Sequence, residues 1–217
     1  MNFSICQINP SVGDLKYNYE KIVKFYNKSI KLNSNSSSAK WGLITSKGNI
    51  CDWENQEVET KWLEKLGIEG SPVYPGGLFY FEDNPSKQLK RSQKLYREKY
   101  YKKSKHINHL NKNKIRIGYF SSDFRAHPTM YLIASILKLH DKSKFEIYLY
   151  SFAPKEDKYT EIVKKSGCIF KDIKKLNYIE AVELARNDHL DIAIDLMGYI
   201  RFNRMNIFSY RIAPIQI

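Results

Sequence analysis

The pattern of hydrophobic positions changes about halfway along the chain. From residue 115 onward, short apolar runs alternate with stretches of helical periodicity. The predicted strands cover 115–120, 145–151, 168–170 and 192–196, and the predicted helices cover 128–140, 157–166, 178–187 and 203–210. Repeated strand–helix units joined by short loops are typical of a parallel sheet covered by helices on both faces. Residues 114–217 are therefore predicted to form an α/β, Rossmann-like domain.

Before residue 114 the pattern is mostly helical. A short strand at 3–8, a turn and an amphipathic helix are predicted within residues 1–33. The Asn- and Ser-rich residues 33–38 predict a flexible linker. Further helices are expected at 52–66 and from Pro85 to about residue 103, the latter capped by Asp83 or Asn84. We thus expect three parts: a strand–helix segment at 1–33, a linker and helical segment at 34–113, and the sheet at 114–217.

Two further expectations concern the second half. The helix at 128–140 is expected to bury the face made by Tyr131, Leu132, Ile136, Leu137 and Leu139. The chain ends on Ile215-Gln216-Ile217, which read as the first residues of another strand. We therefore expect the 217 residues to be a fragment of a longer protein.

Composition narrows the class of protein. A hydrophobic fraction of 42% is enough for a packed core, and no apolar run approaches the ~20 residues of a membrane span. The N-terminus lacks the basic start and apolar centre of a signal peptide. Cys6, Cys51 and Cys168 lie far apart, so they predict neither a disulfide framework nor a zinc site. We expect a cytoplasmic protein that does not enter a membrane.

The net charge of +13 is concentrated in one segment. Residues 87–116 contain twelve Lys or Arg and a single acid, Glu98. Such a segment can bind acidic partners or nucleic acid, and it can also be a solvated helix and linker. We favour the solvated helix, because the usual motifs that stack on bases or read a groove are absent. A non-catalytic module that binds acidic partners through residues 87–116 stays as an alternative.

The candidate chemistry begins after the first predicted strand of the sheet. A polar turn there brings Asp123 and His127 to the start of the next helix. Open parallel sheets bind ligands outside the carboxyl ends of their strands, and an imidazole exchanges a proton near neutral pH. The alternative for His127 is a residue that caps the helix and is buried by Tyr131. Asp123 is expected to cap the helix, to orient His127, or both.

A second group of polar residues follows the strand at 192–196, at the same edge of the sheet. Asp195, Gly198 and Tyr199 lie there, and Gly198 would let the backbone approach a ligand closely. A simple turn of the chain is the alternative. Arg204 either anchors this loop or faces acidic groups.

Three blocks of sequence resemble the front half of the catalytic region of SPINDLY-like O-linked N-acetylglucosamine transferases. The blocks are Ile115–Phe124 with His127-Pro128-Thr129, then Lys144–Ser151, then Asp191–Tyr199 continuing through Arg204 to Arg211-Ile212-Ala213-Pro214-Ile215-Gln216. A weaker likeness extends upstream to about residue 40. Ile200 departs from the Thr that usually follows this Gly-Tyr pair.

The resemblance implies part of the first lobe of a two-lobed, B-type glycosyltransferase. Such an enzyme holds a nucleotide sugar between its lobes and transfers N-acetylglucosamine from UDP-GlcNAc to Ser or Thr of acceptor proteins, without a cofactor or metal. Tetratricopeptide repeats would precede this region, and the second lobe would follow residue 217, so the fragment alone is not expected to catalyse transfer. His127 would be the catalytic residue. The residues expected near the nucleotide sugar are Asp123, Pro128, Thr129, Asp195, Gly198, Tyr199 and Arg204.

Residues 3–33 show a second, short resemblance. The run Ile5-Cys6-Gln7-Ile8-Asn9-Pro10-Ser11-Val12-Gly13-Asp14 is similar to the opening of the nitrilase-type amidase domain of glutamine-dependent NAD synthetases. That family works through a Glu–Lys–Cys triad, which this chain does not supply. We interpret the segment as a remnant, a fusion artefact or a coincidence, and a remnant of an amidase/NAD synthetase fusion stays as an alternative.

Overall fold

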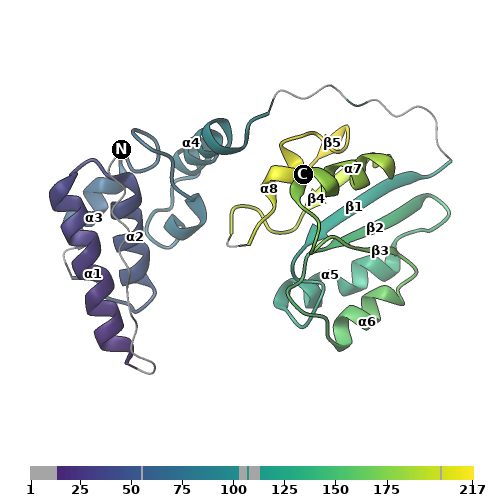
Figure 1. The fold of residues 1–217 in the computed structure, drawn as a ribbon, viewed down its shortest axis with the longest axis horizontal. Helices are drawn as coiled ribbons and strands as arrows, with labels where there is room; N and C mark the ends of the chain where they lie inside the picture. Colours follow the sequence, from purple (N-terminus) through teal and green to yellow (C-terminus); the bar gives the residue numbers. More distant parts are fainter. Residues whose placement is uncertain (1–13, 55, 103–106, 108–112, 201) are drawn as a thin grey trace. The chain divides into compact units, whose positions relative to one another are not determined.

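A computed structural model describes residues 14–54, 56–102, 107, 113–200 and 202–217. The chain divides into two compact units, with the boundary between Lys99 and Tyr100. Figure 1 labels the elements of both units. The strand and most of the turn predicted at the N-terminus lie outside the described residues. Within the described ranges, none of the helices combines the length and the apolar character that crossing a bilayer requires.

The first unit is helical. Its elements are α1 (Leu15–Leu32), α2 (Ser37–Gly48), α3 (Gln56–Leu63), the 3-10 turn η1 (Pro75–Leu78) and α4 (Pro85–Leu95), which continues into the π-helical turn η2 (Tyr96–Tyr100). The last residue of η2, Tyr100, already belongs to the second unit. A small core of buried apolar side chains holds α2, α3 and η1 together; its members are Ile44, Leu63, Leu66, Val73 and Leu78. The amide oxygen of Asn84 accepts a hydrogen bond from the backbone N–H of Lys87 at 3.0 Å, so Asn84 caps α4 as predicted.

The prediction of a flexible linker at 33–38 was wrong for residues 36–38. Helix α2 begins at Ser37, and the hydroxyl of Ser36 accepts a hydrogen bond from the N–H of Ala39 at 3.3 Å. Serine is a good N-cap, so an Asn/Ser-rich run can start a helix as well as interrupt one. Ser37 and Ala39 are buried, because the apolar residues that follow pack into the core of this unit.

Arg91 of α4 is fully buried in the first unit. Its guanidinium donates to the carbonyl oxygens of Leu66 (2.8 Å) and Leu63 (2.5 Å) and forms an ion pair with Glu82 (2.6 Å). Glu82 also pairs with Lys87 at 2.8 Å. Every side of the buried cation therefore meets an acceptor, as a charge removed from water requires.

The second unit is a five-stranded parallel sheet with helices on both faces, which confirms the predicted fold class. Its strands are β1 (Ile115–Ser121), β2 (Phe145–Ser151), β3 (Ile169–Asp172), β4 (Ile192–Asp195) and β5 (Ile215–Gln216), in the order β3-β2-β1-β4-β5. The helices are α5 (Pro128–Leu139), α6 (Lys158–Lys164), α7 (Tyr178–Asn187) and α8 (Met205–Phe208).

Alternate residues of β1 and β2 point to opposite faces of the sheet and build two cores. Ile117, Tyr119, Ile147 and Leu149 pack against α5 and α6. Phe120, Tyr148 and Tyr150 pack on the other face, against α7 and α8. Figure 1 shows the sheet between these two pairs of helices. Both faces are covered, so the strands read as nearly continuous apolar runs.

The buried face predicted for α5 was wrong in all but one residue. Leu137 is 1% exposed, but the other four side chains are exposed by 50–81%: Tyr131, Leu132, Ile136 and Leu139. The sheet is contacted instead by Met130, Ile133, Ala134 and Leu137. This helix has two apolar stripes, each with helical spacing, and the sequence does not reveal which stripe faces the sheet.

Candidate functional site

The site predicted from the sequence lies where the direction of winding of the sheet reverses. Strand β1 lies in the middle of the sheet. The chain continues from β1 to β2 and β3 on one side of it, and then crosses to β4 and β5 on its other side. The carboxyl ends of β1 and β4 lie next to each other, with Phe120 opposite Asp195. The N–H of Leu196 donates to the carbonyl of Phe120 at 3.1 Å, so the two loops begin side by side. Open α/β sheets bind their ligands at this type of switch point.

Met197 joins the two loops. Its thioether sulfur lies 3.4 Å from the hydroxyl oxygen and 3.5 Å from the backbone nitrogen of Ser122, and 3.6 Å from the hydroxyl of Ser121. The side chain is 5% exposed. This contact was not predicted, because a methionine after a strand has no signature that distinguishes it from an ordinary core residue.

Asp195 shapes the turn that follows β4. Its two carboxylate oxygens accept hydrogen bonds from the backbone N–H groups of Met197 and Gly198, each at 3.0 Å. Burial raises the pKa of Asp195, although these two hydrogen bonds act in the opposite direction. The result is a tight turn that presents the backbone of residues 197–198 at the edge of the sheet.

Gly198 lies in the left-handed region of backbone conformation, which is compatible both with close approach of a ligand and with a simple turn of the chain. Its φ is +56°, a value that few residues with a side chain adopt. Apart from Gly198 itself and its two chain neighbours, none of the described residues has a heavy atom within 4 Å of the position that a Cβ would take. The glycine therefore leaves open space in front of its backbone, into which another molecule can come close.

His127 is the N-cap of α5, with Pro128 as the first residue of the helix. Its Nδ1 atom accepts a hydrogen bond from the N–H of Thr129 at 3.3 Å and lies 3.2 Å from the Thr129 hydroxyl. The cap is thus His127 itself, and the expectation that Asp123 caps this helix was wrong. Tyr131 does not bury the imidazole: it is 55% exposed and packs against Tyr159, while the His127 side chain keeps 34% exposure.

Asp123 lies next to the imidazole of His127, and it is only 4% exposed. One carboxylate oxygen contacts the hydroxyl of Ser122 (3.1 Å) and the guanidinium of Arg125 (3.2 Å). The other lies 3.4 Å from Nδ1 of His127. Two tautomers of the imidazole are therefore supported. With the proton on Nε2, Nδ1 caps the helix; with the proton on Nδ1, the carboxylate holds it and Nε2 has a lone pair that can accept a proton.

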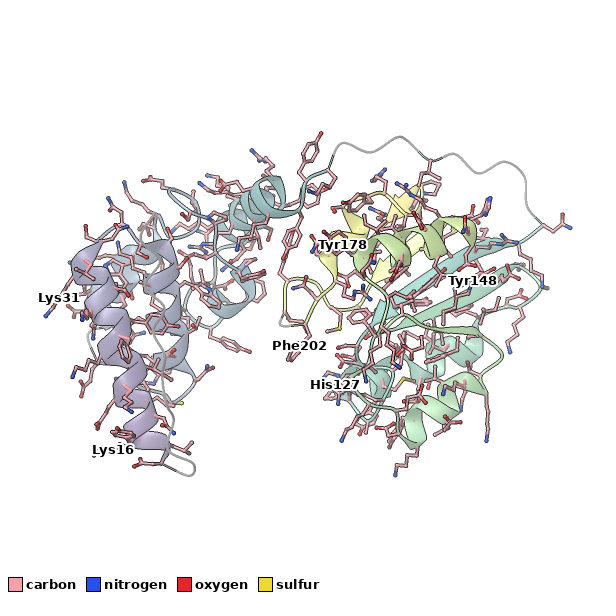
Figure 2. The ribbon with its side chains drawn as sticks, in the orientation of Figure 1. Lys16, Lys31, His127, Tyr148, Tyr178 and Phe202 are labelled. Atoms are coloured by element: carbon pink, nitrogen blue, oxygen red, sulfur yellow. The ribbon has the colours of Figure 1, made fainter. Side chains whose placement is uncertain are left out.

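Arg204 and Tyr199 are engaged in other contacts. The Arg204 guanidinium donates to the carbonyls of Ile173 and Leu176, both at 2.8 Å, and so anchors the loop after β3. Burial lowers its pKa. The ring of Tyr199 lies 6.3 Å from that of Tyr100, measured between centroids. Figure 2 shows His127 and Phe202 at the same end of the sheet, away from Tyr148 in its interior.

A further pair of residues holds the loop after β1, and the sequence analysis did not single them out. The carboxylate of Asp157 accepts a hydrogen bond from the N–H of Ala126 at 2.7 Å. The hydroxyl of Thr160 donates to the carbonyl of Phe124 at 2.8 Å. Both residues belong to the capping box of α6. The spacing of an Asp and a Thr three residues apart predicts the cap, but not its contact with a distant loop.

No cluster of three or more His, Cys, Asp or Glu side chains with the geometry of a metal site occurs among the residues that the structure describes. The candidate site therefore consists of a histidine with an adjacent carboxylate on one loop and an open, glycine-containing turn on the neighbouring loop.

Known proteins share part of this sequence and its fold. The chain is 33% identical over 107 residues to the probable UDP-N-acetylglucosamine–peptide N-acetylglucosaminyltransferase SPINDLY of Arabidopsis thaliana, covering 48% of this chain and 12% of that protein. It is 34% identical over 109 residues to the UDP-N-acetylglucosamine–peptide N-acetylglucosaminyltransferase of Caenorhabditis elegans, covering 49% and 10%. The matched part thus spans about a tenth of the length of these curated relatives.

A solved structure, a mutant of the Thermobaculum terrenum O-GlcNAc transferase, has the same fold with a TM-score of 0.66 at 22% identity, and the match covers 91% of this chain and 40% of that one. The model of glycosyl transferase family 41 matches residues 86–217, which include the whole sheet and both loops of the candidate site. This chain belongs to glycosyl transferase family 41.

Proposed function

We propose that this chain forms part of the first lobe of a protein O-glycosyltransferase. The whole protein would transfer N-acetylglucosamine from UDP-GlcNAc to Ser or Thr hydroxyls of acceptor proteins. Family membership and the names of two relatives support this reaction. The observation that supports the position of the site is the meeting of the loops after β1 and β4 at the switch point of the sheet.

His127 is the proposed general base. Its Nε2 would take the proton of the acceptor hydroxyl while the hydroxyl oxygen forms a bond to the anomeric carbon and the bond to the UDP oxygen breaks. Asp123 supports this role, because a proton held on Nδ1 by its carboxylate leaves the lone pair on Nε2. Pro128 starts α5 directly after His127, and the Thr129 hydroxyl, 3.2 Å from Nδ1, can also accept the Nδ1 proton in this tautomer.

Gly198 and the turn held by Asp195 are proposed to border the donor. The open space in front of Gly198 supports close approach of a ligand to the backbone. Tyr199 and Arg204 would keep this loop in place rather than bind the sugar, since each already has a partner in the fold. We assign acceptor recognition to tetratricopeptide repeats elsewhere in the whole protein. A cytosolic location rests on the scattered cysteines, of which Cys51 and Cys168 are free thiols.

The contacts of the basic segment do not favour the alternative of a charged interaction module. Within the described part of residues 87–116, several cations have partners inside their own unit: Lys87 with Glu64 and Glu82, Arg91 with Glu82, Lys94 with Glu98, and Arg116 with Glu146. Cations that stabilise the fold are less available to a polyanion. We therefore do not propose nucleic acid as a partner.

Hydrogen exchange of the whole protein, measured by mass spectrometry with and without UDP-GlcNAc, tests the position of the site. Binding of the donor is expected to slow amide exchange in residues 122–129 and 196–200. Residues 187–191, which precede β4 at the opposite edge of the sheet, serve as the internal control and are expected to exchange at an unchanged rate. Absence of binding, or protection confined to the control segment, would contradict the proposal.

A further inference from the structure

We propose that Asp157 and Thr160, at the start of α6, are positioning residues that hold the loop carrying His127 in its working geometry. This inference rests on the proposed function, because it assigns the two residues a role in the reaction that His127 performs. Neither residue would touch the nucleotide sugar. They would act through the backbone of residues 124–126, which leads directly into the N-cap of α5.

The two side chains contact the loop at both ends of this short segment. Asp157 accepts from the N–H of Ala126 at 2.7 Å, one residue before His127. Thr160 donates to the carbonyl of Phe124 at 2.8 Å. Thr160 and Phe124 are both fully buried, so this second contact is shielded from water. A loop held at two points by side chains from a neighbouring helix has little freedom to shift.

These contacts go beyond what a helix cap requires. One oxygen of Asp157, Oδ1, accepts from the N–H groups of Tyr159 (2.9 Å) and Thr160 (3.3 Å), which completes the cap. The other oxygen, Oδ2, is directed at Ala126. The carboxylate thus performs two separate tasks with its two oxygens. The hydrogen bond from Ala126 is also the largest cause of the lowered pKa of Asp157.

The same capping box occurs at α7 without a contact to the site loops, which provides a matched control. The amide oxygen of Asn177 accepts from the N–H groups of Ile179 (2.9 Å) and Glu180 (3.1 Å), and Glu180 accepts from the N–H of Asn177 (2.8 Å). Replacing either cap residue by Ala removes a comparable set of helix-capping bonds. Only Asp157→Ala also removes the hydrogen bond to Ala126.

The test compares Asp157→Ala with Asn177→Ala in the whole protein. We expect the amide of Ala126 to exchange about tenfold faster in Asp157→Ala and at the wild-type rate in Asn177→Ala, because one hydrogen bond is lost only in the first variant. We expect kcat for transfer to fall about tenfold or more in Asp157→Ala with KM for UDP-GlcNAc unchanged, since small misplacements of a reacting group are costly. Asn177→Ala should keep the wild-type kcat.

Substitutions of Thr160 provide a second, independent test if Asp157→Ala does not fold. Thr160→Val removes the hydroxyl that binds Phe124, and Thr160→Ser restores it, so kcat should fall in the first variant and recover in the second. Equal kcat values for Asp157→Ala and Asn177→Ala, or for Thr160→Val and Thr160→Ser, would overturn the inference. If the wild-type protein transfers no sugar, the proposed function fails instead. The positioning role is then tested by the exchange rate at Ala126 and the NMR signals of the His127 ring. A change in both for Asp157→Ala but not for Asn177→Ala would support the role, and no change in either would contradict it.

Discussion

The Nδ1 atom of His127 lies 3.4 Å from Oδ2 of Asp123, whose side chain is 4% exposed. The same nitrogen lies 3.3 Å from the backbone nitrogen of Thr129. A carboxylate favours a proton on Nδ1, whereas the N–H of Thr129 favours a lone pair there. The tautomer of His127 is thus set by competition between Asp123 and the start of α5, and this competition decides whether Nε2 can accept a proton.

Asp123→Asn is expected to change the outcome of this competition. The uncharged amide holds the Nδ1 proton less well, so the tautomer that caps the helix gains and Nε2 loses its lone pair. Transfer should fall by at least about tenfold, as part of the general-base contribution. The ¹⁵N chemical shifts of the ring at neutral pH report the tautomer directly. Asp141→Asn, in an exposed turn after α5, is the control; equal transfer by the two variants would contradict the role of Asp123.

The buried ion pair between Arg91 and Glu82 predicts the largest single loss of stability in the first unit. Glu82→Gln leaves a fully buried guanidinium without its counter-charge, which is expected to cost about 3–5 kcal/mol. The control is Glu64→Gln, which removes the other partner of Lys87. The Glu64 side chain is 69% exposed, so this change should alter the free energy of unfolding by less than about 0.5 kcal/mol. Urea unfolding of both variants separates these expectations, and similar losses would show that the buried pair is not decisive.

Asp195 predicts an unusual dependence of stability on pH. Burial raises the pKa of Asp195 in the folded state above its usual value of 3.8. At pH values between 3.8 and the folded pKa, the folded protein therefore binds more protons than the unfolded protein. The stabilising contribution of Asp195 is therefore complete below the unfolded pKa and is lost as pH rises through the folded pKa. Asp195→Asn removes this titration. The free energy of unfolding of Asp195→Asn minus that of the wild type should rise as pH increases from about 4. A difference that does not change with pH would contradict a raised pKa of Asp195.

The two apolar stripes of α5 predict effects of very different size for the same substitution, Leu to Ala. Leu137→Ala empties a site that is 1% exposed, and is expected to cost about 2–5 kcal/mol. Leu139→Ala, at a position that is 81% exposed, should change stability by less than about 0.5 kcal/mol. Thermal unfolding of the two variants measures the difference. Equal losses would mean that the outer stripe is covered as well as the inner one.

The sequence predicted the two longest strands of the sheet, β1 and β2, well because each is a largely apolar run closed by a turn. Helix α7 was predicted with its observed bounds, and β1 and β2 to within one residue, since burial on both faces leaves a strong signal in the sequence. Helix α2 was missed, because its serines favour a cap and a linker equally. The phase of α5 was wrong for a related reason: two stripes of equal spacing cannot be ranked without the sheet.

The candidate site was predictable in position but not in its contacts. The order of strands and loops brings His127 and Gly198 to one edge once the sheet is parallel. The cap formed by His127 is a local contact with Thr129, and it was one of the alternatives that the sequence offered. The contact of the Met197 sulfur with Ser122 and the hydrogen bond from Ala126 to Asp157 instead join residues that are 75 and 31 positions apart. Periodicity and motif spacing report only neighbours along the chain, so such contacts leave no signal there.

Transfer of labelled N-acetylglucosamine from UDP-GlcNAc to acceptor protein, by the whole protein and its His127→Ala variant, tests the central claim most directly. His140→Asn, at the other end of α5, is the matched control. We predict that the wild-type protein and His140→Asn transfer the sugar, and that His127→Ala is slower by about 100-fold or more. Transfer by His127→Ala at the wild-type rate would contradict the account.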